Sequence, residues 1–290
     1  MRTRMACVML ELLSWSWAAF AAQELGCYAY AYRDSSPPSR RALWDGYEVS
    51  VGPTPAAREN PDYGCTAAIY NRAGRVVFRT TGFNVVFDED GTGMDFDGDG
   101  KAEVVLKSDT GGGNHCCWSY HVVSLWPKPH ELVEIPEPGA VRFEEDQQGR
   151  VVIWAHTPGP TGVGPLAERP FADRALRFSA GKFVDVTSEF CADMFSDSNQ
   201  TFWQLTPERI RRFQSARGSS ESWSQQEKET ADVLLSRALQ RVFCRQYEEA
   251  LSDLDLWPEA TREGMKADFA KSVKEDYPDF ATRLTRSVRK

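Results

Sequence analysis

The nine residues from Asp95 to Glu103, DFDGDGKAE, constrain the fold of this chain more than any other stretch. Three aspartates at alternate positions are followed by a glycine and then by a glutamate, so that carboxylates crowd around one tight turn. Ca²⁺ prefers about six to eight oxygen ligands at about 2.4 Å, which such a turn supplies. The sequence therefore predicts a Ca²⁺ site whose ligands are Asp95, Asp97, Asp99, the backbone carbonyl of Lys101, and Glu103.

The residues after this loop predict a β-strand instead of a helix. An EF-hand loop ends on a bidentate glutamate at about its twelfth position, and that position is Leu106 in this chain. Val104, Val105 and Leu106 form a short, apolar, β-prone run without helical periodicity. We therefore expect the loop to connect two strands of a sheet.

The loop and the strand after it resemble the cation loop of FG-GAP/VCBS-type repeats, the Ca²⁺-binding β-propeller blades of many secreted bacterial proteins and of integrin α-chains. In those repeats a D-x-D-x-D-G-x-x-D/E loop leads directly into an apolar strand, as it does here. The resemblance covers about one blade, from Phe83 to Leu125, and the sequence has no second copy of the loop and no upstream Phe-Gly or Gly-Ala-Pro signature. It implies a Ca²⁺ site at the five loop residues, and it does not extend to a complete propeller or to an adhesion role.

Residues 1–22 have the layout of a secretory signal peptide. Arg2 and Arg4 give a positive start, an apolar run interrupted by Glu11 follows, and alanines near Phe20 suit a signal peptidase. The run is shorter than the roughly 18 apolar residues that a membrane-spanning helix requires. We expect a secreted or periplasmic protein with no membrane span after signal removal, and an uncleaved anchor is the alternative.

The composition argues against a general nucleic-acid-binding role and against disorder. The chain has 290 residues, a formal net charge of −8 and a pI near 5.2, whereas phosphate contacts require clustered lysines and arginines. Nine tryptophans and sixteen phenylalanines supply large apolar side chains for packed cores. The length allows one large domain or two modest ones.

Six cysteines follow the predicted signal peptide, at positions 27, 65, 116, 117, 191 and 244. An even number in an exported chain indicates a set of disulfides. The neighbours Cys116 and Cys117 are poor partners for each other, because disulfide geometry disfavours so small a ring. We predict that Cys191 pairs with Cys244, and that Cys27 and Cys65 pair with Cys116 and Cys117.

Residues 23–190 predict a β-rich domain, and the whole chain is predicted to be α+β. Short β-prone runs recur about every ten residues between polar turns, which fits a mainly antiparallel sandwich or a partial propeller of about three blades. Loops are expected at Arg33–Arg41 and Thr157–Pro165, and a turn at His130. The strands are expected at Tyr47–Val51, Cys65–Tyr70, Val76–Thr80, Val85–Phe87, Glu103–Leu106, Trp118–Leu125, Val141–Phe143, Val151–Ala155, Leu176–Phe178 and Phe183–Val186.

Residues 191–290 predict a small C-terminal α-helical bundle packed on the sheets. Thr206-Pro207-Glu208 combines a capping residue, a proline and an early acid at a helix start. Ser224 to Glu227 matches a capping box. The segment from Ala238 to Leu251 faintly resembles one tetratricopeptide-like helical pair, but solenoids need about three such repeats.

The segment from Ser108 to His121, SDTGGGNHCCWSYH, contains further candidates. Its three glycines could form an anion-binding nest, although a turn before a strand is the simpler interpretation. A Zn²⁺ or copper site is conceivable from imidazole and thiolate ligands, but neighbouring strand cysteines would face opposite sides. The candidate ligands of that site are His115, Cys116, Cys117 and His121, and Asp88, Asp90 and Asp109 are candidate additional ligands for Ca²⁺.

The sequence carries no nucleophile elbow, zincin motif or Walker A motif. Glu144 and Glu145 could be drawn as an acid–base pair, but adjacent strand residues face opposite ways. The first hypothesis is a secreted or periplasmic Ca²⁺-binding, non-catalytic protein with a protein or carbohydrate partner. The alternatives are an exported hydrolase that uses carboxylates or a metal-bound water, and an envelope assembly factor that acts through its helical half.

Overall fold

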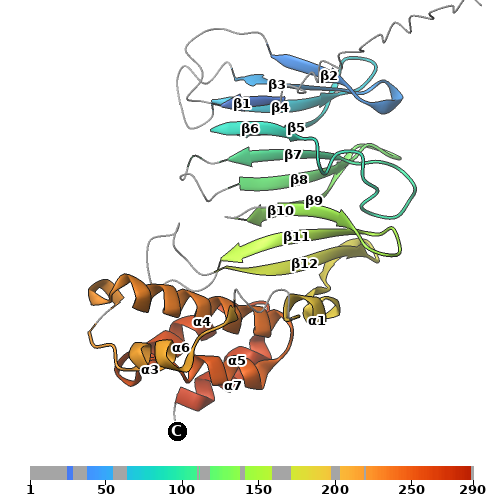
Figure 1. Ribbon diagram of the computed structural model, residues 1–290. Coiled ribbons are helices and arrows are strands. Elements are labelled where there is room, and N and C mark those ends of the chain that lie inside the picture. Colours follow the sequence, from blue (N-terminus) through green and yellow to red (C-terminus); the bar gives the residue numbers. More distant parts are fainter. Residues whose placement is uncertain are drawn as a thin grey trace, which may run out of the picture.

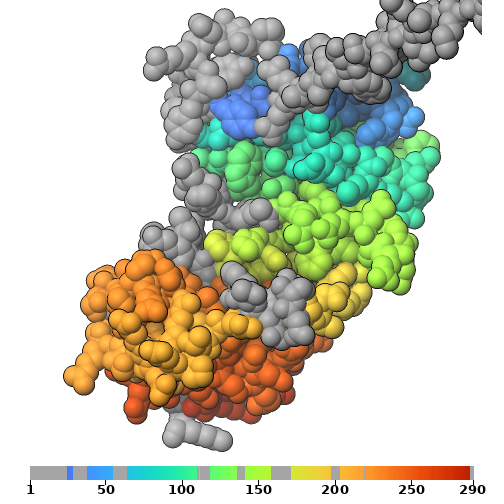
Figure 2. Space-filling model, in the orientation of Figure 1, coloured from blue at the N-terminus to red at the C-terminus, as the bar shows by residue number. Residues whose placement is uncertain are grey.

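A computed structural model describes residues 25–28, 38–54, 64–109, 111, 118–137, 141–158, 171–196, 203–218 and 220–288. The predicted signal peptide lies outside these residues. The predicted α+β class is confirmed, because antiparallel sheets fill the N-terminal part and helices gather in the C-terminal part. The sheets lie one above another, and the helices cover the last of them (Figure 1). In the space-filling view the sheets and the helices form one continuous body (Figure 2).

Each of the three sheets contains a run of consecutive strands joined as an antiparallel meander. The first sheet has the order β2 (Ser39–Ala42), β3 (Glu48–Pro53), β4 (Cys65–Tyr70) and β5 (Val76–Gly82). The second has the order β1 (Gly26–Tyr28), β6 (Asn84–Asp88), β7 (Val104–Asp109), β8 (Trp118–Ser124) and β9 (His130–Glu137). The third has the order β10 (Val141–Glu145), β11 (Val151–Pro158), β12 (Phe171–Ser179) and β13 (Lys182–Asp185).

The second sheet is buried on both faces, which explains the unbroken apolar run after the acidic loop. Side chains alternate between the two faces of a strand. Val104 and Leu106 of β7 pack into the core shared with the first sheet, whereas Val105 packs into the core shared with the third. Ile69 lies in the first core and Ile153 in the second, and all five residues are fully buried. The three sheets are therefore held together mainly by two apolar layers.

The helical part forms its own apolar core and packs on β12. Thr206 and Ser224 cap their helices as predicted, the latter with the complete capping box to Glu227. Phe213, Phe269 and Phe280 are fully buried in this core. The helices are α1 (Cys191–Met194), α3 (Pro207–Gln214), α4 (Gln225–Phe243), α5 (Tyr247–Leu254), α6 (Glu259–Val273) and α7 (Pro278–Val288), with short 3-10 turns at Trp44–Gly46, Thr187–Glu189 and Ser220–Ser222.

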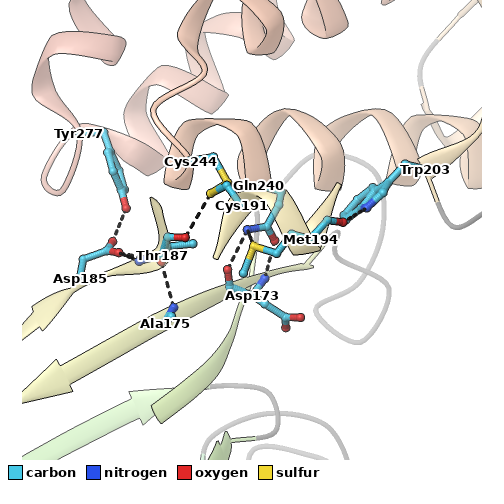
Figure 3. Close-up of a disulfide and its surroundings, with 10 residues drawn as sticks. All are labelled: Asp173, Ala175, Asp185, Thr187, Cys191, Met194, Trp203, Gln240, Cys244 and Tyr277. Atoms are coloured by element: carbon cyan, nitrogen blue, oxygen red, sulfur yellow. Dashed lines mark hydrogen bonds between the residues drawn. A yellow bond between two sulfur atoms is a disulfide. The ribbon is translucent and has the colours of Figure 1, made fainter. Parts of the chain in front are cut away.

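Each of the two disulfides in the described residues joins neighbouring layers. The predicted Cys191–Cys244 bond is confirmed, and it ties α1 to the C-terminal end of α4 (Figure 3). The predicted pairing of Cys27 and Cys65 with Cys116 and Cys117 is wrong, because Cys27 of β1 bonds Cys65 of β4 and so links the second sheet to the first. Residues 116 and 117 lie outside the described residues. Stable disulfides of this kind are typical of an oxidising compartment.

Three local expectations for the β-rich half are also wrong. The loop expected at Thr157–Pro165 does not begin at Thr157, because Thr157 and Pro158 are the last residues of β11 and pair with β12. His130 does not sit in a turn, because it is the first residue of β9. The residues before it, including the cis Trp126–Pro127 peptide bond, make the turn instead. The loop expected at Arg33–Arg41 gives way to β2 from Ser39 onward, where pairing with β3 satisfies the backbone.

Side chains from α4 complete the exposed edge of β12 (Figure 3). β13 pairs only with residues 176–179 of β12, so the earlier half of that strand has one unpaired side. Gln240 covers it, since its amide accepts the Asp173 N–H at 2.9 Å and donates to the Asp173 carbonyl at 3.0 Å. Ser236 accepts the Phe171 N–H at 3.2 Å. The helix therefore takes the place of another strand and protects this edge from pairing with other chains.

A second polar contact between sheet and helices centres on Asp185, at the end of β13. The Tyr277 hydroxyl donates to it from the connection before α7, and Thr187 donates through both its N–H and its hydroxyl (Figure 3). Arg174 also pairs with Asp185, at 3.0 Å. Burial raises the pKa of Asp185, but these hydrogen bonds and the Arg174 charge outweigh it and hold the pKa below its usual value of 3.8.

Acidification is expected to weaken this contact between sheet and helices. A carboxyl whose pKa is lowered on folding contributes stability that is complete above its unfolded pKa and is lost as the pH falls through the folded value. The urea midpoint of the wild-type chain should therefore drop as the pH falls below about 4. Asp185→Asn should lack this component of the acid response, and identical pH profiles for both chains would contradict the assignment.

Candidate metal centre

The acidic loop connects β6 to β7 of the middle sheet (Figure 1). Phe96 anchors it, because this side chain is buried between the second and third sheets and meets the Phe143 ring edge-on at 5.4 Å. The backbone N–H of Glu103 donates to the Met94 carbonyl at 2.9 Å, which closes the base of the loop. The aspartates on either side of Phe96 are therefore held at the rim of the sheet stack.

Asp95 organises the turn through backbone hydrogen bonds. Its Oδ1 accepts the N–H groups of Gly98 and Asp99 at 2.7 and 3.1 Å, and its Oδ2 accepts the N–H of Gly100 at 2.8 Å. Both glycines have positive φ, +78° and +80°, which other residues adopt only with strain. An ionised carboxylate has about four lone-pair positions, so Asp95 keeps acceptor capacity for a cation.

The loop aspartates come together as the sequence predicts. Asp95, Asp97 and Asp99 each offer an oxygen, and these oxygens lie within 4.8 Å of one another. Burial raises the pKa of Asp97; the Asp99 N–H opposes this effect, and the charges of Asp99 and Asp95 add to it. Among the described residues, no lysine or arginine forms an ion pair with these three carboxylates. The cluster therefore carries negative charge that no described lysine or arginine neutralises, and of the described side-chain charges only that of His130 acts against the rise in the pKa of Asp97.

Glu103 is the unusual member of the set, because its carboxylate is completely buried. Its Oε2 accepts the Phe96 N–H at 2.8 Å, while its Oε1 has no hydrogen-bond partner among the described residues. Burial raises the pKa of Glu103 to about 7; the Phe96 N–H opposes the rise, and the charges of Asp97 and Asp95 reinforce it. The nearby Ser124 hydroxyl lowers this pKa, yet its hydrogen is already donated to the Trp126 carbonyl.

The remaining predicted ligands take different positions. The Lys101 ammonium lies 5.7 Å from the centre of the Trp126 ring, a cation–π contact that leaves its backbone carbonyl as the only ligand atom it could offer. Asp88 accepts the Gly91 N–H and pairs with Lys107 at 3.2 Å. Asp109 accepts from Asn84 and from Gly111. Asp88 and Asp109 thus have partners outside the loop, and Asp90 is exposed.

The Zn²⁺ or copper hypothesis at residues 115–121 falls largely outside the described residues. His115, Cys116 and Cys117 are not described, and neither are two of the three adjacent glycines. His121 lies on β8 and is buried. Sequence reasoning missed the residues around His121, because its partners come from three other strands.

A pocket of about 430 Å³ lies on the face of the third sheet that carries α1. Trp154 and Phe190 meet edge-on at 4.9 Å within it, and Arg142 lies 5.4 Å from the centre of the Trp154 ring. Glu144 and Glu145 both border this pocket, and Glu144 pairs with Arg142 at 2.8 Å. The lining residues are Arg142, Glu144, Glu145, Asp146, Val152, Trp154, Asp173, Phe190, Asp193 and Met194.

Comparison with known proteins adds little to this description. No protein family and no curated protein matches the chain. Among solved structures, the chain is similar to PliI-Ah, a periplasmic lysozyme inhibitor of I-type lysozyme from Aeromonas hydrophyla, with 15% identity and a TM-score of 0.25 over 34% of this chain and 88% of that one. Within the described residues, no helix has the length and apolar character needed to cross a membrane.

Proposed function

We propose that this chain is an exported, Ca²⁺-binding, non-catalytic interaction protein whose acidic loop is completed by the ion. The observation that carries the proposal is Glu103, a fully buried carboxylate with one oxygen that has no described partner. It lies near enough to the aspartate cluster for the charges of Asp97 and Asp95 to raise its pKa, although its oxygens are not among the three that lie within 4.8 Å of one another. Burying a charge without a partner is costly, and buried carboxylates are normally paired or bound to metal. A divalent cation beside Glu103 removes that cost.

The ligand chemistry favours Ca²⁺ over other metals. The predicted set contains only oxygen atoms, four of its members are carboxylates, and the loop has two left-handed glycines that let the backbone wrap around an ion. Hard cations take oxygen ligands, and Ca²⁺ accepts more ligands and looser geometry than Mg²⁺ does. Asp95, Asp97 and Glu103 would bind through side-chain oxygens, Lys101 through its carbonyl, and Asp99 directly or through water.

Export fits both the disulfides and the cation. Cys27–Cys65 and Cys191–Cys244 require an oxidising compartment to persist. Extracellular Ca²⁺ sites bind with dissociation constants of about 0.1 to 1 mM, so a site of this class is filled outside the cytosol. The N-terminal Arg2 to Ala22 segment has the layout of a signal peptide that would direct the chain there.

The partner surface is proposed to be the acidic pocket on the third sheet. Five carboxylates and one arginine border it. Three of these carboxylates already pair with arginine or histidine side chains, namely Glu144 with Arg142, Asp146 with Arg150 and Arg177, and Asp173 with His156. Glu145, which has no described ion pair, is therefore the carboxylate that can attract the positive charge of a partner. Trp154 adds an aromatic face that suits either a cation or a sugar ring. A protein partner that presents a lysine or arginine to Glu145 is favoured over a neutral carbohydrate. This assignment is independent of the Ca²⁺ loop.

Calcium is expected to raise the melting temperature of the full chain. At a free concentration about ten times the dissociation constant, mass action adds about 1.4 kcal/mol to the free energy of unfolding. For a chain of this size that corresponds to roughly 3 to 5 °C, measured by differential scanning calorimetry in CaCl₂ and in EGTA. Asp97→Asn should abolish most of the difference, and a wild-type melt that is identical in both buffers would refute the structural role of the ion.

A further inference from the structure

His121 sits in a polar cluster within the apolar layer between the first and second sheets. Its Nε2 lies 3.0 Å from the Ser108 hydroxyl and 3.1 Å from the Thr80 hydroxyl, and its Nδ1 lies 2.7 Å from Oε1 of Glu131. The Phe78 ring packs against the imidazole at 5.9 Å. The His121 side chain is 10% exposed and the Glu131 side chain 35%, so the cluster runs from the buried interior to the surface.

A β-bulge in β9 brings a second glutamate to this cluster. Glu131 and Glu134 are three residues apart, so on a regular strand they would face opposite sides of the sheet. The pairing shifts here, because His121 lies opposite Glu134 while Val123 lies opposite Glu131, which leaves Leu132 as the extra residue. The shift turns Glu131 to the same side as Glu134. Bulges commonly re-aim side chains near functional sites.

The three side chains converge to the spacing of a metal site. One ligand atom each from His121, Glu131 and Glu134 lies within 4.8 Å of the others. Tetrahedral ligands at about 2.1 Å from Zn²⁺ are about 3.4 Å apart, a spacing that the exposed glutamates reach by small rotations. Among the described residues, no lysine or arginine pairs with Glu134. The two negative charges therefore lie beside one imidazole without a described basic residue.

The contacts of Nε2 are those expected of a histidine that binds a metal through its other ring nitrogen, Nδ1. Hydroxyl oxygens accept as well as donate hydrogen bonds, so the oxygens of Ser108 and Thr80 can accept the Nε2–H. In that tautomer the Nδ1 lone pair points toward the glutamates. A metal-binding histidine almost always donates its second ring N–H to an acceptor, which fixes the orientation of the ring, and the two hydroxyl oxygens supply that acceptor here.

A catalytic interpretation of the same atoms is less consistent with the burial. Ser108, His121 and Glu131 are connected in the order of a nucleophile, a base and an orienting acid. Ser108 is only 8% exposed and lies on β7 in the layer between two sheets. A hydroxyl in that place orients the ring and cannot meet a substrate.

We propose that His121, Glu131 and Glu134 form a second metal site, which binds Zn²⁺ through one nitrogen and two carboxylates. Imidazole with carboxylates is a suitable ligand set for Zn²⁺, and three protein ligands leave a fourth position for water. That position faces solvent, because both glutamates are on the exposed side of the cluster. The site shares no residue with the Ca²⁺ loop, so the failure of either proposal leaves the other standing.

Isothermal titration of ZnCl₂ into the full chain tests the proposal, with Ca²⁺ present to saturate the acidic loop and free thiols blocked by iodoacetamide. The wild-type chain is expected to bind one Zn²⁺ at this site. Glu134→Gln should weaken binding at least about tenfold, since losing even an outer-sphere partner of a metal site costs about 10- to 100-fold. Glu131→Gln should have a similar effect, and Ser108→Ala a smaller one.

Two control variants separate this site from other sources of Zn²⁺ binding. Glu145→Gln changes an exposed strand glutamate on the third sheet, and Asp97→Asn disables the Ca²⁺ loop. Both should bind Zn²⁺ as the wild type does, while circular dichroism shows that all variants are folded. An absence of Zn²⁺ uptake by the wild type, or equal uptake by Glu134→Gln and wild type, would overturn the proposal.

Discussion

Replacing Cys191 and Cys244 together by alanine is expected to lower the free energy of unfolding by about 4 kcal/mol. The disulfide closes a loop of 53 residues that contains α3 and α4, and the entropy of the unfolded chain rises when this loop is opened. Since the bond joins α1 to the end of α4, its loss should loosen the helices from the third sheet. Amide hydrogen exchange within α4 should therefore become faster.

The second disulfide supplies the matched control. Replacing Cys27 and Cys65 by alanine opens a loop of 38 residues and should cost a similar free energy, about 4 kcal/mol. That bond joins β1 to β4, so its removal should accelerate exchange in the first and second sheets and leave local openings of α4 unchanged. Equal exchange patterns in the two double variants would contradict the assignment of each bond to its own pair of layers.

Leu106→Ala is expected to lower the free energy of unfolding by about 2 to 5 kcal/mol. Leu106 is fully buried between the first and second sheets, where the surrounding strands cannot collapse into the cavity that the substitution leaves. Urea denaturation followed by tryptophan fluorescence measures the loss. The size of the effect reports how much of the stability of the stack resides in this apolar layer.

Val76→Ala is the control for this substitution, because Val76 is a strand residue that is 41% exposed. Its free energy of unfolding should stay within about 0.5 kcal/mol of the wild type. If Leu106→Ala were equally mild, the first and second sheets could not be packed face to face as described.

Most strands and helix starts could be predicted, because their signals are local. β4 spans the predicted Cys65–Tyr70, and the capping residues Thr206 and Ser224 act as expected. Alternating apolar residues and caps are read within a few positions of the chain. The Cys191–Cys244 pairing could be predicted for a related reason, because both residues border the helical part.

The features that the sequence did not reveal depend on contacts between distant strands. Nothing near Cys27 indicates that β1 joins the second sheet opposite β4, and pairing of cysteines cannot be deduced from their positions alone. The bulge at Leu132 is a property of pairing between β8 and β9. Without it Glu131 and Glu134 would face opposite sides of the sheet, so the cluster around His121 was not predicted.

The candidate Ca²⁺ site could be predicted only in part from the sequence. The spacing of Asp95, Asp97 and Asp99 predicts their convergence, because one tight loop brings them together. The complete burial of Glu103 and the unpartnered state of its Oε1 depend on how the loop packs through Phe96 between two sheets. That burial supports the proposal of an ion at the loop over a solvated acidic turn, and it cannot be read from the spacing of the loop residues.

Calorimetric titration of CaCl₂ into the full chain tests the central claim most directly. The wild-type chain is expected to bind one Ca²⁺ per molecule at the loop, and Asp97→Asn and Asp99→Asn should each lose most of this binding. Asp90→Asn, which changes an exposed aspartate of the same connection, should bind normally. No Ca²⁺ uptake by the wild type, or undiminished uptake by Asp97→Asn and Asp99→Asn, would contradict the account.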